Sequence, residues 1–294
     1  MAKSISGLDE RLRRTSPVRS IQMGDTTVTY VPDGAAQLTP RWLPATTDEV
    51  WAAHPEYLDT TGNMVASIGG LLVEHDGRSL LIDAGFGPCS LSAEAGRPLG
   101  AIHGGDLLDN LTALGRRPED VEAVAITHLH TDHIGWAWQP VPGTDRLAFP
   151  DAGYLVAEPE WSGRHLVKAH ISPRALDVLE PRVRMVGEGE EIFPGVHVMP
   201  TPGHTPGHTA YVIGSGDLRL IAFGDAMHSP IQIDHPEWSA APDYDPKQSE
   251  DSRRRLIAEM AEPGTIGFGV HFADVIFGRV DPRAEGPAWQ PCRV

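Results

Sequence analysis

A segment near the middle of the chain, Thr127 to Gly135, is dense in side chains that bind metal ions. It has the sequence THLHTDHIG and places three histidines and one aspartate in six consecutive positions: His128, His130, Asp132 and His133. Neutral imidazole and carboxylate are ligands that suit zinc and related divalent ions. In extended backbone His128 and His130 share a face, whereas a turn lets Asp132 and His133 diverge. The motif therefore predicts ligands for two neighbouring metal ions.

Three further candidate ligands occur later, each where a predicted strand ends. His204 lies in TPGHTPGH, where proline and glycine fix the turn, Asp225 closes AFGD and His271 closes GFGVH. Ligand-bearing loops at strand ends on one sheet edge are typical of α/β proteins. The chemistry that such a set predicts is hydrolysis, because two divalent ions that share a water lower its pKa to about 7 and polarise the bond under attack.

The sequence offers no protein nucleophile of the usual kinds. It contains no GxSxG motif, and Cys89 and Cys292 lie far from the histidine motifs and in no zinc-ligand spacing. A water-derived nucleophile is therefore favoured. Asp132, oriented by its metal ion, is the candidate that takes up the proton released during the attack.

In the order of these residues the sequence resembles the metallo-β-lactamase superfamily, whose HxHxDH motif is followed by a histidine, an aspartate and a final histidine. The resemblance extends from about Thr26 to the C-terminus and implies a four-layer αββα sandwich of class α/β. It implies a first metal ion held by His128, His130 and His204, and a second held by Asp132, His133 and His271, with Asp225 bridging both. The expected cofactors are two divalent ions per chain, with zinc named first and manganese, cobalt or iron as alternatives.

Within the superfamily, the C-terminal third is similar to the branch of methyl parathion hydrolases and N-acyl-homoserine lactonases, on the segment GDAMHSPIQIDHPEW and the helix before GVHF. This resemblance implies a dinuclear hydrolase that opens a lactone or cleaves another carboxylic ester through a metal-bridging hydroxide. Aryl phosphotriesters are the close alternative, and β-lactams or thioesters come next. A di-iron redox protein is disfavoured, because those members replace the second motif histidine with glutamate, whereas His130 stands here.

Three other polar residues near the motifs are candidates for a catalytic or supporting role at the site. His228 occupies the position where the lactonases carry tyrosine, three residues after the bridging aspartate. It is either a catalytic residue that orients substrate or a histidine that supports the site. His208 is expected to support or pack rather than to bind metal, and Asp83 to brace the first motif or to cap a turn. The candidate catalytic residues are therefore Asp132 and His228.

The elements that must position these residues alternate between strands and helices. Strands are predicted at TTVTYV, ending in a turn at residues 32–34, and on both sides of the Asp-Gly turn at residues 76–77. Helices are predicted over residues 107–114 and over DSRRRLIAEMAE, and the strand VEAVAIT leads into the first motif. Residues 35–62 are expected to form a long loop that covers a pocket or packs on the surface. We expect one domain over residues 21–294 after a mobile N-terminal arm, residues 1–20.

The bulk composition limits the partners. The 294 residues carry a formal net charge of −16, which disfavours nucleic acid and anionic membranes, and no apolar run is long enough to span a bilayer. We expect a cytoplasmic protein and leave a homodimer open. The substrate is expected to be small, neutral and fairly hydrophobic. The apolar residues near the motifs either form its pocket wall or belong to the core: Trp136, Trp138, Met227, Ile231 and Phe272.

Overall fold

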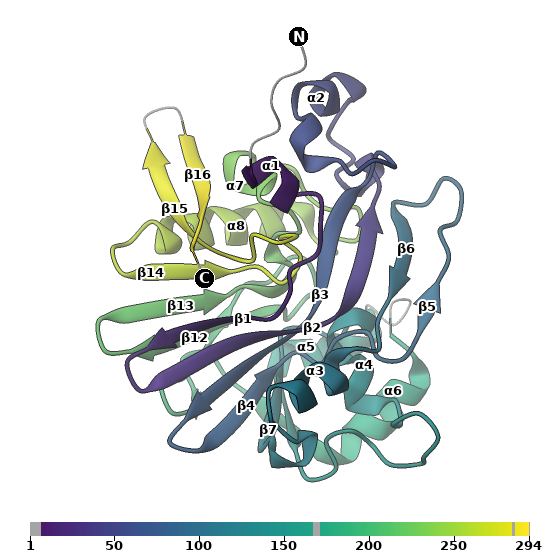
Figure 1. Cartoon of the computed structure of the whole chain (residues 1–294), viewed down its shortest axis with the longest axis vertical. Coiled ribbons are helices and arrows are strands. Elements are labelled where there is room, and N and C mark those ends of the chain that lie inside the picture. Colours follow the sequence, from purple (N-terminus) through teal and green to yellow (C-terminus); the bar gives the residue numbers. More distant parts are fainter. Residues whose placement is uncertain (1–6, 167–170, 284–285, 294) are drawn as a thin grey trace.

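The computed structural model describes residues 7–166, 171–283 and 286–293, and these residues form two β-sheets packed face to face (Figure 1). In the described residues the first sheet has nine strands, in the order β5-β6-β2-β3-β4-β7-β8-β9 with β1 paired to β2. Their bounds are β1 (Arg19–Met23), β2 (Thr26–Leu38), β3 (Met64–His75), β4 (Arg78–Ile82), β5 (Ser90–Leu91), β6 (Leu99–His103), β7 (Ala123–Ile126), β8 (Gly153–Ala157) and β9 (Val183–Val186).

The second sheet follows the chain order from β10 to β16. Its strands are β10 (Glu191–Phe193), β11 (Val196–Pro200), β12 (Thr209–Ser215), β13 (Leu218–Ala222), β14 (Thr265–Phe268), β15 (Phe277–Arg283) and β16 (Gly286–Pro291). All neighbouring strands in this sheet are antiparallel except β13 and β14, which run parallel. The connection between that parallel pair carries the longest helix among the described residues, α8 (Pro246–Met260).

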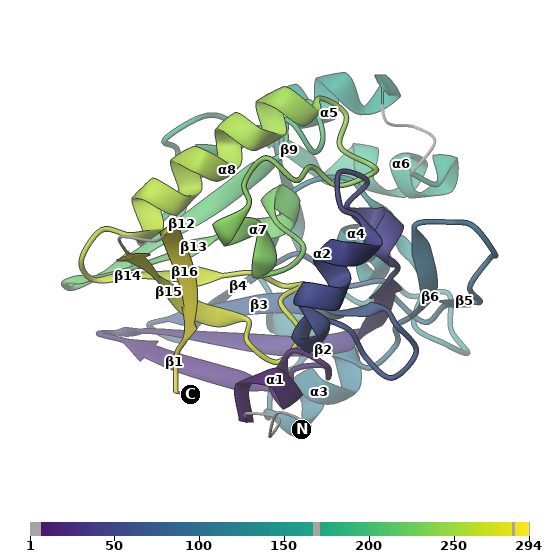
Figure 2. The ribbon, with the colours of Figure 1, turned by 90° about the horizontal axis from the view of Figure 1, so that it is seen from above.

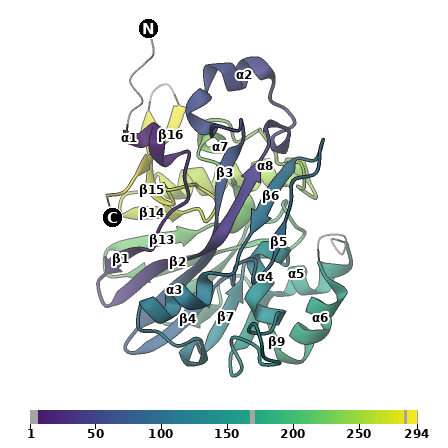
Figure 3. The ribbon, with the colours of Figure 1, turned by 45° about the vertical axis from the view of Figure 1, so that its right-hand side comes forward.

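Helices cover the outer faces of both sheets (Figures 2 and 3). The first sheet is covered by α3 (Leu107–Ala113) and α4 (Thr131–Trp138), with α6 (Pro173–Leu179) packed on α4, and α5 (Glu158–Gly163) follows β8. The second sheet is covered by α7 (Ile231–Asp234) and α8. This is the four-layer αββα arrangement predicted from the sequence. None of the described helices combines the length and the apolar character that crossing a bilayer requires.

The first sheet is buried on both faces, which explains its continuous apolar strands. Successive side chains of a strand point to opposite faces. Tyr30 and Leu71 accordingly join the core between the sheets, whereas their neighbours Val31 and Leu72 join the core under the outer helices. All four side chains are at most 2% exposed.

The ends of five strands meet at one edge of the sandwich. β4 and β7 run parallel in the first sheet, and so do β13 and β14 in the second, so the carboxyl ends of each pair open on the same side. β4 leads to Asp83, β7 leads to the 127–133 motif, and the segments after β11, β13 and β14 carry the remaining candidate ligands. The topology thus gathers residues from distant parts of the sequence.

The predicted turn at residues 32–34 is wrong. β2 continues through Pro32, Asp33 and Gly34 to Leu38, with a register shift against β3 at this point. The Asp33 carboxylate is fully buried and accepts hydrogen bonds from five N–H groups: the backbone of Phe86, Gly87, Gly105 and Leu107, and the indole of Trp136. The Pro-Asp-Gly sequence therefore makes a bulge whose aspartate connects two loops and the helix α4 to the sheet.

Other local predictions are confirmed. The Asp76-Gly77 turn joins β3 to β4 with both residues at positive φ, 49° and 76°, as expected for a hairpin of this sequence. The helix predicted over residues 107–114 is α3, and the later amphipathic helix is α8, which begins earlier than predicted because Asp245 caps its first turn. Residues 35–62 are less irregular than predicted, since they include the end of β2 and the helix α2 (Asp48–Ala53).

The prediction of a mobile arm over residues 1–20 is wrong for residues 7–20, which belong to the folded domain. Residues 1–6 lie outside the described residues. Residues Gly7–Arg11 form the short helix α1, Leu12 is buried, and β1 begins at Arg19 and pairs with β2. The basic residues that suggested a solvated arm instead make ion pairs with the folded domain.

Candidate metal centre

The structure brings the seven candidate ligands together at the edge where the strands end. They form two groups, and within each group one ligand atom per residue lies within 4.8 Å of every other. The first group contains His128, His130, His204 and Asp225, and the second contains Asp132, His133, Asp225 and His271. Asp225 belongs to both groups and is the residue for which the resemblance implies a bridging role.

The two oxygens of the Asp225 carboxylate face different groups. Oδ2 lies 3.7 Å from His128 Nε2 and 3.5 Å from His204 Nε2. Oδ1 lies 3.0 Å from Nε2 of both His133 and His271. The carboxylate therefore stands between two sets of imidazoles, with one oxygen turned toward each set.

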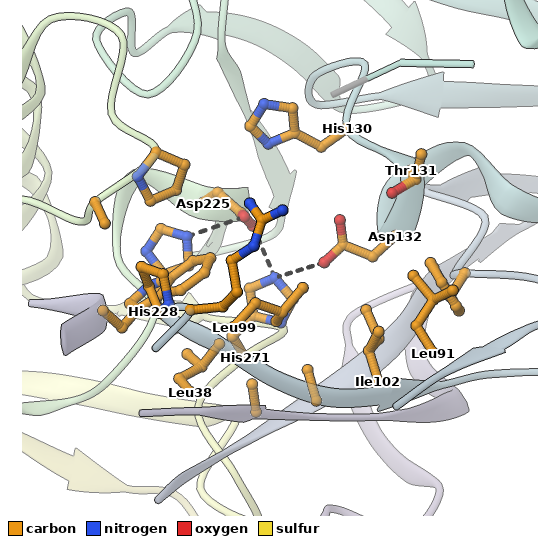
Figure 4. Close-up of a pocket in the computed structure, with 18 of the residues that line it drawn as sticks. Leu38, Leu91, Leu99, Ile102, His130, Thr131, Asp132, Asp225, His228 and His271 are labelled. Atoms are coloured by element: carbon orange, nitrogen blue, oxygen red, sulfur yellow. Dashed lines mark ion pairs between the residues drawn. The ribbon is translucent and has the colours of Figure 1, made fainter. Parts of the chain in front are cut away.

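Asp132 completes the second group from the pocket side (Figure 4). Its Oδ2 lies 3.6 Å from His271 Nε2 and 3.8 Å from His133 Nε2, and its side chain is 21% exposed. Asp225, by contrast, is buried. Asp132 is therefore the carboxylate of the cluster that a bound substrate can reach.

The donor set fits divalent metal ions. Buried polar atoms in proteins almost always have hydrogen-bond partners. Nε2 of His128, Nε2 of His133 and Oδ1 of Asp225 are buried and yet have no hydrogen-bond partner among the described residues, although His133 and Asp225 approach to 3.0 Å. Close approach without hydrogen-bond geometry is what ligands aimed at a shared central ion would show. Imidazole nitrogens and carboxylate oxygens in this number suit zinc and related ions.

The second nitrogen of three candidate ligand histidines is held by an acceptor. Nδ1 of His133 lies 2.8 Å from the Asp83 carboxylate, and Nδ1 of His204 lies 2.8 Å from Asp243. Nδ1 of His271 donates to the backbone carbonyl of Ser67 at 2.8 Å. An acceptor at Nδ1 fixes the proton there, so Nε2 is left to face the cluster.

Asp83 braces the first motif, in line with one of the two roles considered for it. Besides His133, it accepts hydrogen bonds from the backbone N–H and the hydroxyl of Thr127. Asp83 is itself held at φ 60°, where a non-glycine residue is uncommon. Sequence reasoning missed the roles of Asp243 and Ser67, because neither residue lies in a local motif.

His208 and Glu160 support the same loops without joining either group. His208 Nε2 accepts the backbone N–H of Asp225 at 3.0 Å, and burial lowers the pKa of His208 to about 3, so this imidazole is neutral. This agrees with the supporting role expected for it. Glu160 is buried, which raises its pKa, and it accepts the N–H of Leu129 and of Gly207. Glu160 thus joins the first motif to the TPGHTPGH loop.

The electrostatic field of the cluster favours positive charge at its centre. Burial alone would raise the pKa of Asp225, but His133 and His271 hold it well below its usual value. Burial alone would lower the pKa of His133, but Asp225 and Asp83 raise it well above the ordinary histidine value. The neighbouring carboxylates therefore change the pKa of His133 more than burial does, as expected of a site that binds cations.

A pocket of about 690 Å³ opens over the two groups. Its floor includes Asp132, Asp225 and His271 from the cluster, together with His228. Nε2 of His228 lies 3.1 Å from Asp225 Oδ2, and its ring packs edge-on against Trp42. One wall is aliphatic and comes from β2 and the β5–β6 hairpin, and Figure 4 shows its side chains beside the polar cluster: Leu38, Leu91, Leu99 and Ile102.

The pocket wall differs from the one suggested by the sequence. Trp136, Met227, Ile231 and Phe272 are at most 1% exposed, and they pack in the core, which was the other role considered for them. Trp138 packs beside the core under the outer helices. Phe272 therefore belongs to the core and does not line the pocket. Trp42, by contrast, belongs to the 35–62 segment that was considered as a cover, and it lines the pocket.

The comparisons with known proteins agree with the fold. Residues 70–269 match the family model of the metallo-beta-lactamase superfamily. A metallo-beta-lactamase domain-containing protein 1 from Xenopus laevis is 29% identical over 200 residues, which cover 67% of this chain and 73% of that protein. An N-acyl homoserine lactonase from Bacillus thuringiensis is 26% identical over 214 residues, which cover 68% of this chain and 79% of that protein.

Two solved structures superimpose over nearly the whole chain. One, described as AidC, a dizinc quorum-quenching lactonase in complex with a product, has a TM-score of 0.81 at 23% identity, covering 96% of this chain and 99% of that one. The other, described as the hydrolase AbOPH of the beta lactamase superfamily, has a TM-score of 0.80 at 25% identity, with the same coverage.

The family model spans more than half of the chain, so the protein belongs to the metallo-β-lactamase superfamily. Within it, the protein is a metal-dependent hydrolase related to N-acyl homoserine lactonases.

Proposed function

We propose that this protein hydrolyses a lactone or another carboxylic ester at a centre of two divalent metal ions, with zinc as the native metal. The observation that carries the proposal is the Asp225 carboxylate, whose oxygens face two separate imidazole groups on the floor of a pocket with an aliphatic wall. Asp225 is buried, so a lone anion at this position would be costly without cations beside it.

The proposed ligands follow the two groups. His128, His130 and His204 would hold the first ion, Asp132, His133 and His271 would hold the second, and Asp225 would contact both. Two bound divalent ions supply a water that is deprotonated near neutral pH and a Lewis acid for the carbonyl oxygen.

Asp132 is the proposed proton carrier. Its carboxylate faces the pocket and is the more exposed of the two in the cluster. Asp132 accepts the proton that remains on the attacking hydroxide as its oxygen bonds to the ester carbonyl carbon, the first proton of the water having already gone to solvent. It returns that proton to the alkoxide oxygen released when the C–O bond breaks, so the products of a lactone are a carboxylate and an alcohol in one molecule.

His228 is proposed to orient the substrate. It lies on the pocket floor next to Asp225, and its two ring nitrogens are buried without a hydrogen-bond partner among the described residues. An imidazole N–H at this position can donate to the carbonyl oxygen of the ester, whose negative charge grows during the attack. Trp42 packs against this ring and restricts its rotation.

The aliphatic wall suggests what the rest of the substrate is. Leu38, Leu99 and Ile102 face the space beside the metal groups, and each buried methylene of a substrate chain contributes about 0.8 kcal/mol. We therefore propose a small neutral substrate with an apolar portion. The strongly negative chain would repel anionic substrates before they reach the pocket.

A hydrolysis panel tests the proposal. Protein loaded with zinc, and in parallel with manganese, cobalt or iron, is assayed against lactones, aryl esters, an aryl phosphotriester, a thioester and a β-lactam, before and after chelation. We expect lactone or ester cleavage that chelation abolishes and added metal restores. Activity that survives complete metal removal would contradict the two-metal mechanism, and exclusive cleavage of the phosphotriester would contradict the substrate class.

A further inference from the structure

The loop between β14 and β15 carries His271 and, three residues later, a buried carboxylate with three arginine partners. Asp274 has no exposed side-chain surface. Arg14 donates to its Oδ2 through Nε at 3.0 Å and Nη2 at 2.8 Å, and Arg19 donates to its Oδ1 at 2.7 Å. Nε of Arg11 lies 3.5 Å from Oδ2. All three arginines belong to the N-terminal segment, residues 11–19.

The same segment also forms hydrogen bonds with the backbone of this loop. The N–H of Asp274 donates to the Arg11 carbonyl at 3.1 Å, and the Arg11 guanidinium donates to the Asp274 carbonyl. Figure 1 shows the segment after α1 running beside the C-terminal part of the chain on its way to β1. Residue 274 is therefore fixed through its side chain and through both of its peptide groups.

Ser67, on β3, forms a second connection between the segment and the histidine. Its hydroxyl accepts the N–H of Ser16 at 2.9 Å and donates to the carbonyl of Ala273 at 2.9 Å. Its own carbonyl accepts Nδ1–H of His271 at 2.8 Å. One buried residue thus contacts the N-terminal segment, the loop and the imidazole ring.

The loop needs such support because of its backbone. Ala273 has a φ of 45°, in the left-handed region that residues with a side chain seldom adopt. A loop held in this conformation relaxes when its contacts are removed, and His271 lies only two residues away. Residues 11–19 hold residue 274 directly, and Ser16 is connected to the carbonyl of Ala273 through the hydroxyl of Ser67.

We propose that residues 11–19 act as a clamp that positions His271 for the second metal ion, with Asp274 and Ser67 as positioning residues. This inference rests on the two-metal function proposed above. It assigns the N-terminal segment a part in assembling the site, although none of its residues belongs to either ligand group. Weakening the clamp should lower the affinity for the second ion and leave the first ion in place.

The test uses the full-length chain and measures metal retention rather than turnover. Asp274→Asn and Ser67→Ala are dialysed against zinc buffers of graded free concentration, and bound zinc is counted by elemental analysis. We expect the second zinc to bind about 10 to 100 times more weakly, as for other groups that support a ligand histidine, and the first to change less than threefold. Arg78→Gln, which removes the exposed pair with Glu122 at the far end of β4, is the matched control and should bind both ions normally.

A double-mutant cycle separates positioning from general stability. In a His271→Ala background, adding Asp274→Asn should weaken the remaining zinc less than threefold, because the side chain that the clamp positions is already gone. If Asp274→Asn does not fold, Ser67→Ala carries the test. Folded variants that bind the second ion like the wild type, or that lose both ions equally, would overturn the inference. A wild-type chain that binds fewer than two ions would overturn the proposed function itself.

Discussion

Replacing Asp243 with asparagine tests how the first metal position is assembled. The Asp243 side chain is fully buried, and its Oδ1 accepts Nδ1–H of His204 at 2.8 Å. Its Oδ2 accepts the backbone N–H of Ala240 at 3.1 Å and Nη1 of Arg253 at 3.2 Å. The carboxylate thus orients one proposed ligand and neutralises one buried guanidinium.

Asparagine cannot satisfy both demands, because it has one acceptor oxygen where the carboxylate has two. If its oxygen faces His204, its NH₂ group points at the N–H donors of Ala240 and Arg253. If it rotates, its NH₂ group faces Nδ1 of His204, which shifts the imidazole proton to Nε2 and blocks metal binding there. Either orientation disfavours the native site.

The expected magnitude follows from these contacts. Loss of the group that orients a ligand histidine costs about 10 to 100-fold in metal affinity, or about 1.4 to 2.7 kcal/mol. The Arg253 side chain is 1% exposed and loses its carboxylate partner, so the free energy of unfolding should fall by about 3 kcal/mol. The two effects are separable, because the first is measured on folded protein.

The assay is zinc retention against graded chelator, followed by urea unfolding of the metal-free protein. Asp245→Asn is the matched control, since Asp245 caps α8 through its side chain and asparagine caps equally well. We expect Asp243→Asn to lose the zinc of the first group, which includes His204, at a chelator concentration at least tenfold lower than Asp245→Asn does. Equal retention in the two variants would refute the claim that Asp243 orients His204.

Three further changes probe other parts of the account. His228→Ala should lower turnover about 100-fold while two metal ions per chain remain, measured by steady-state kinetics and elemental analysis, and loss of metal would show that it is a ligand. Asp33→Ala leaves five N–H donors without their acceptor and should cost at least about 3 kcal/mol in urea unfolding, so a loss under 1 kcal/mol would contradict its anchoring role. Leu99→Ala should raise KM for long-chain esters about tenfold and spare short-chain ones, and an equal effect on both would exclude the aliphatic wall as a binding surface.

The convergence of the candidate ligands was predictable because each follows a strand. Parallel strands open their carboxyl ends on the same side, so the topology that brings β7 and β14 into the two sheets also brings His128 and His271 toward one edge. The hairpin at residues 76–77 was predictable for a local reason, the positive φ that Asp-Gly tolerates. Local turn chemistry and the order of the strands are therefore enough to predict the ligand-bearing edge and this hairpin.

The supporting residues were not predictable, because tertiary contacts alone define them. Asp33 occurs in a Pro-Asp-Gly sequence typical of turns, and its role depends on donors 53 to 103 positions away. Asp274 pairs with arginines more than 250 positions away. Because nothing near these arginines in the sequence indicates that partner, the basic N-terminal segment resembles a free arm when only its composition is considered. Phe272 adjoins a proposed ligand but points into the core, because neighbouring side chains diverge.

The most direct test of two metal ions at this site is anomalous diffraction from a crystal of the zinc-loaded protein, recorded above and below the zinc edge. We expect two peaks about 3.5 to 4 Å apart, one beside each oxygen of Asp225. A single peak, or none within reach of the Asp225 carboxylate, would contradict it.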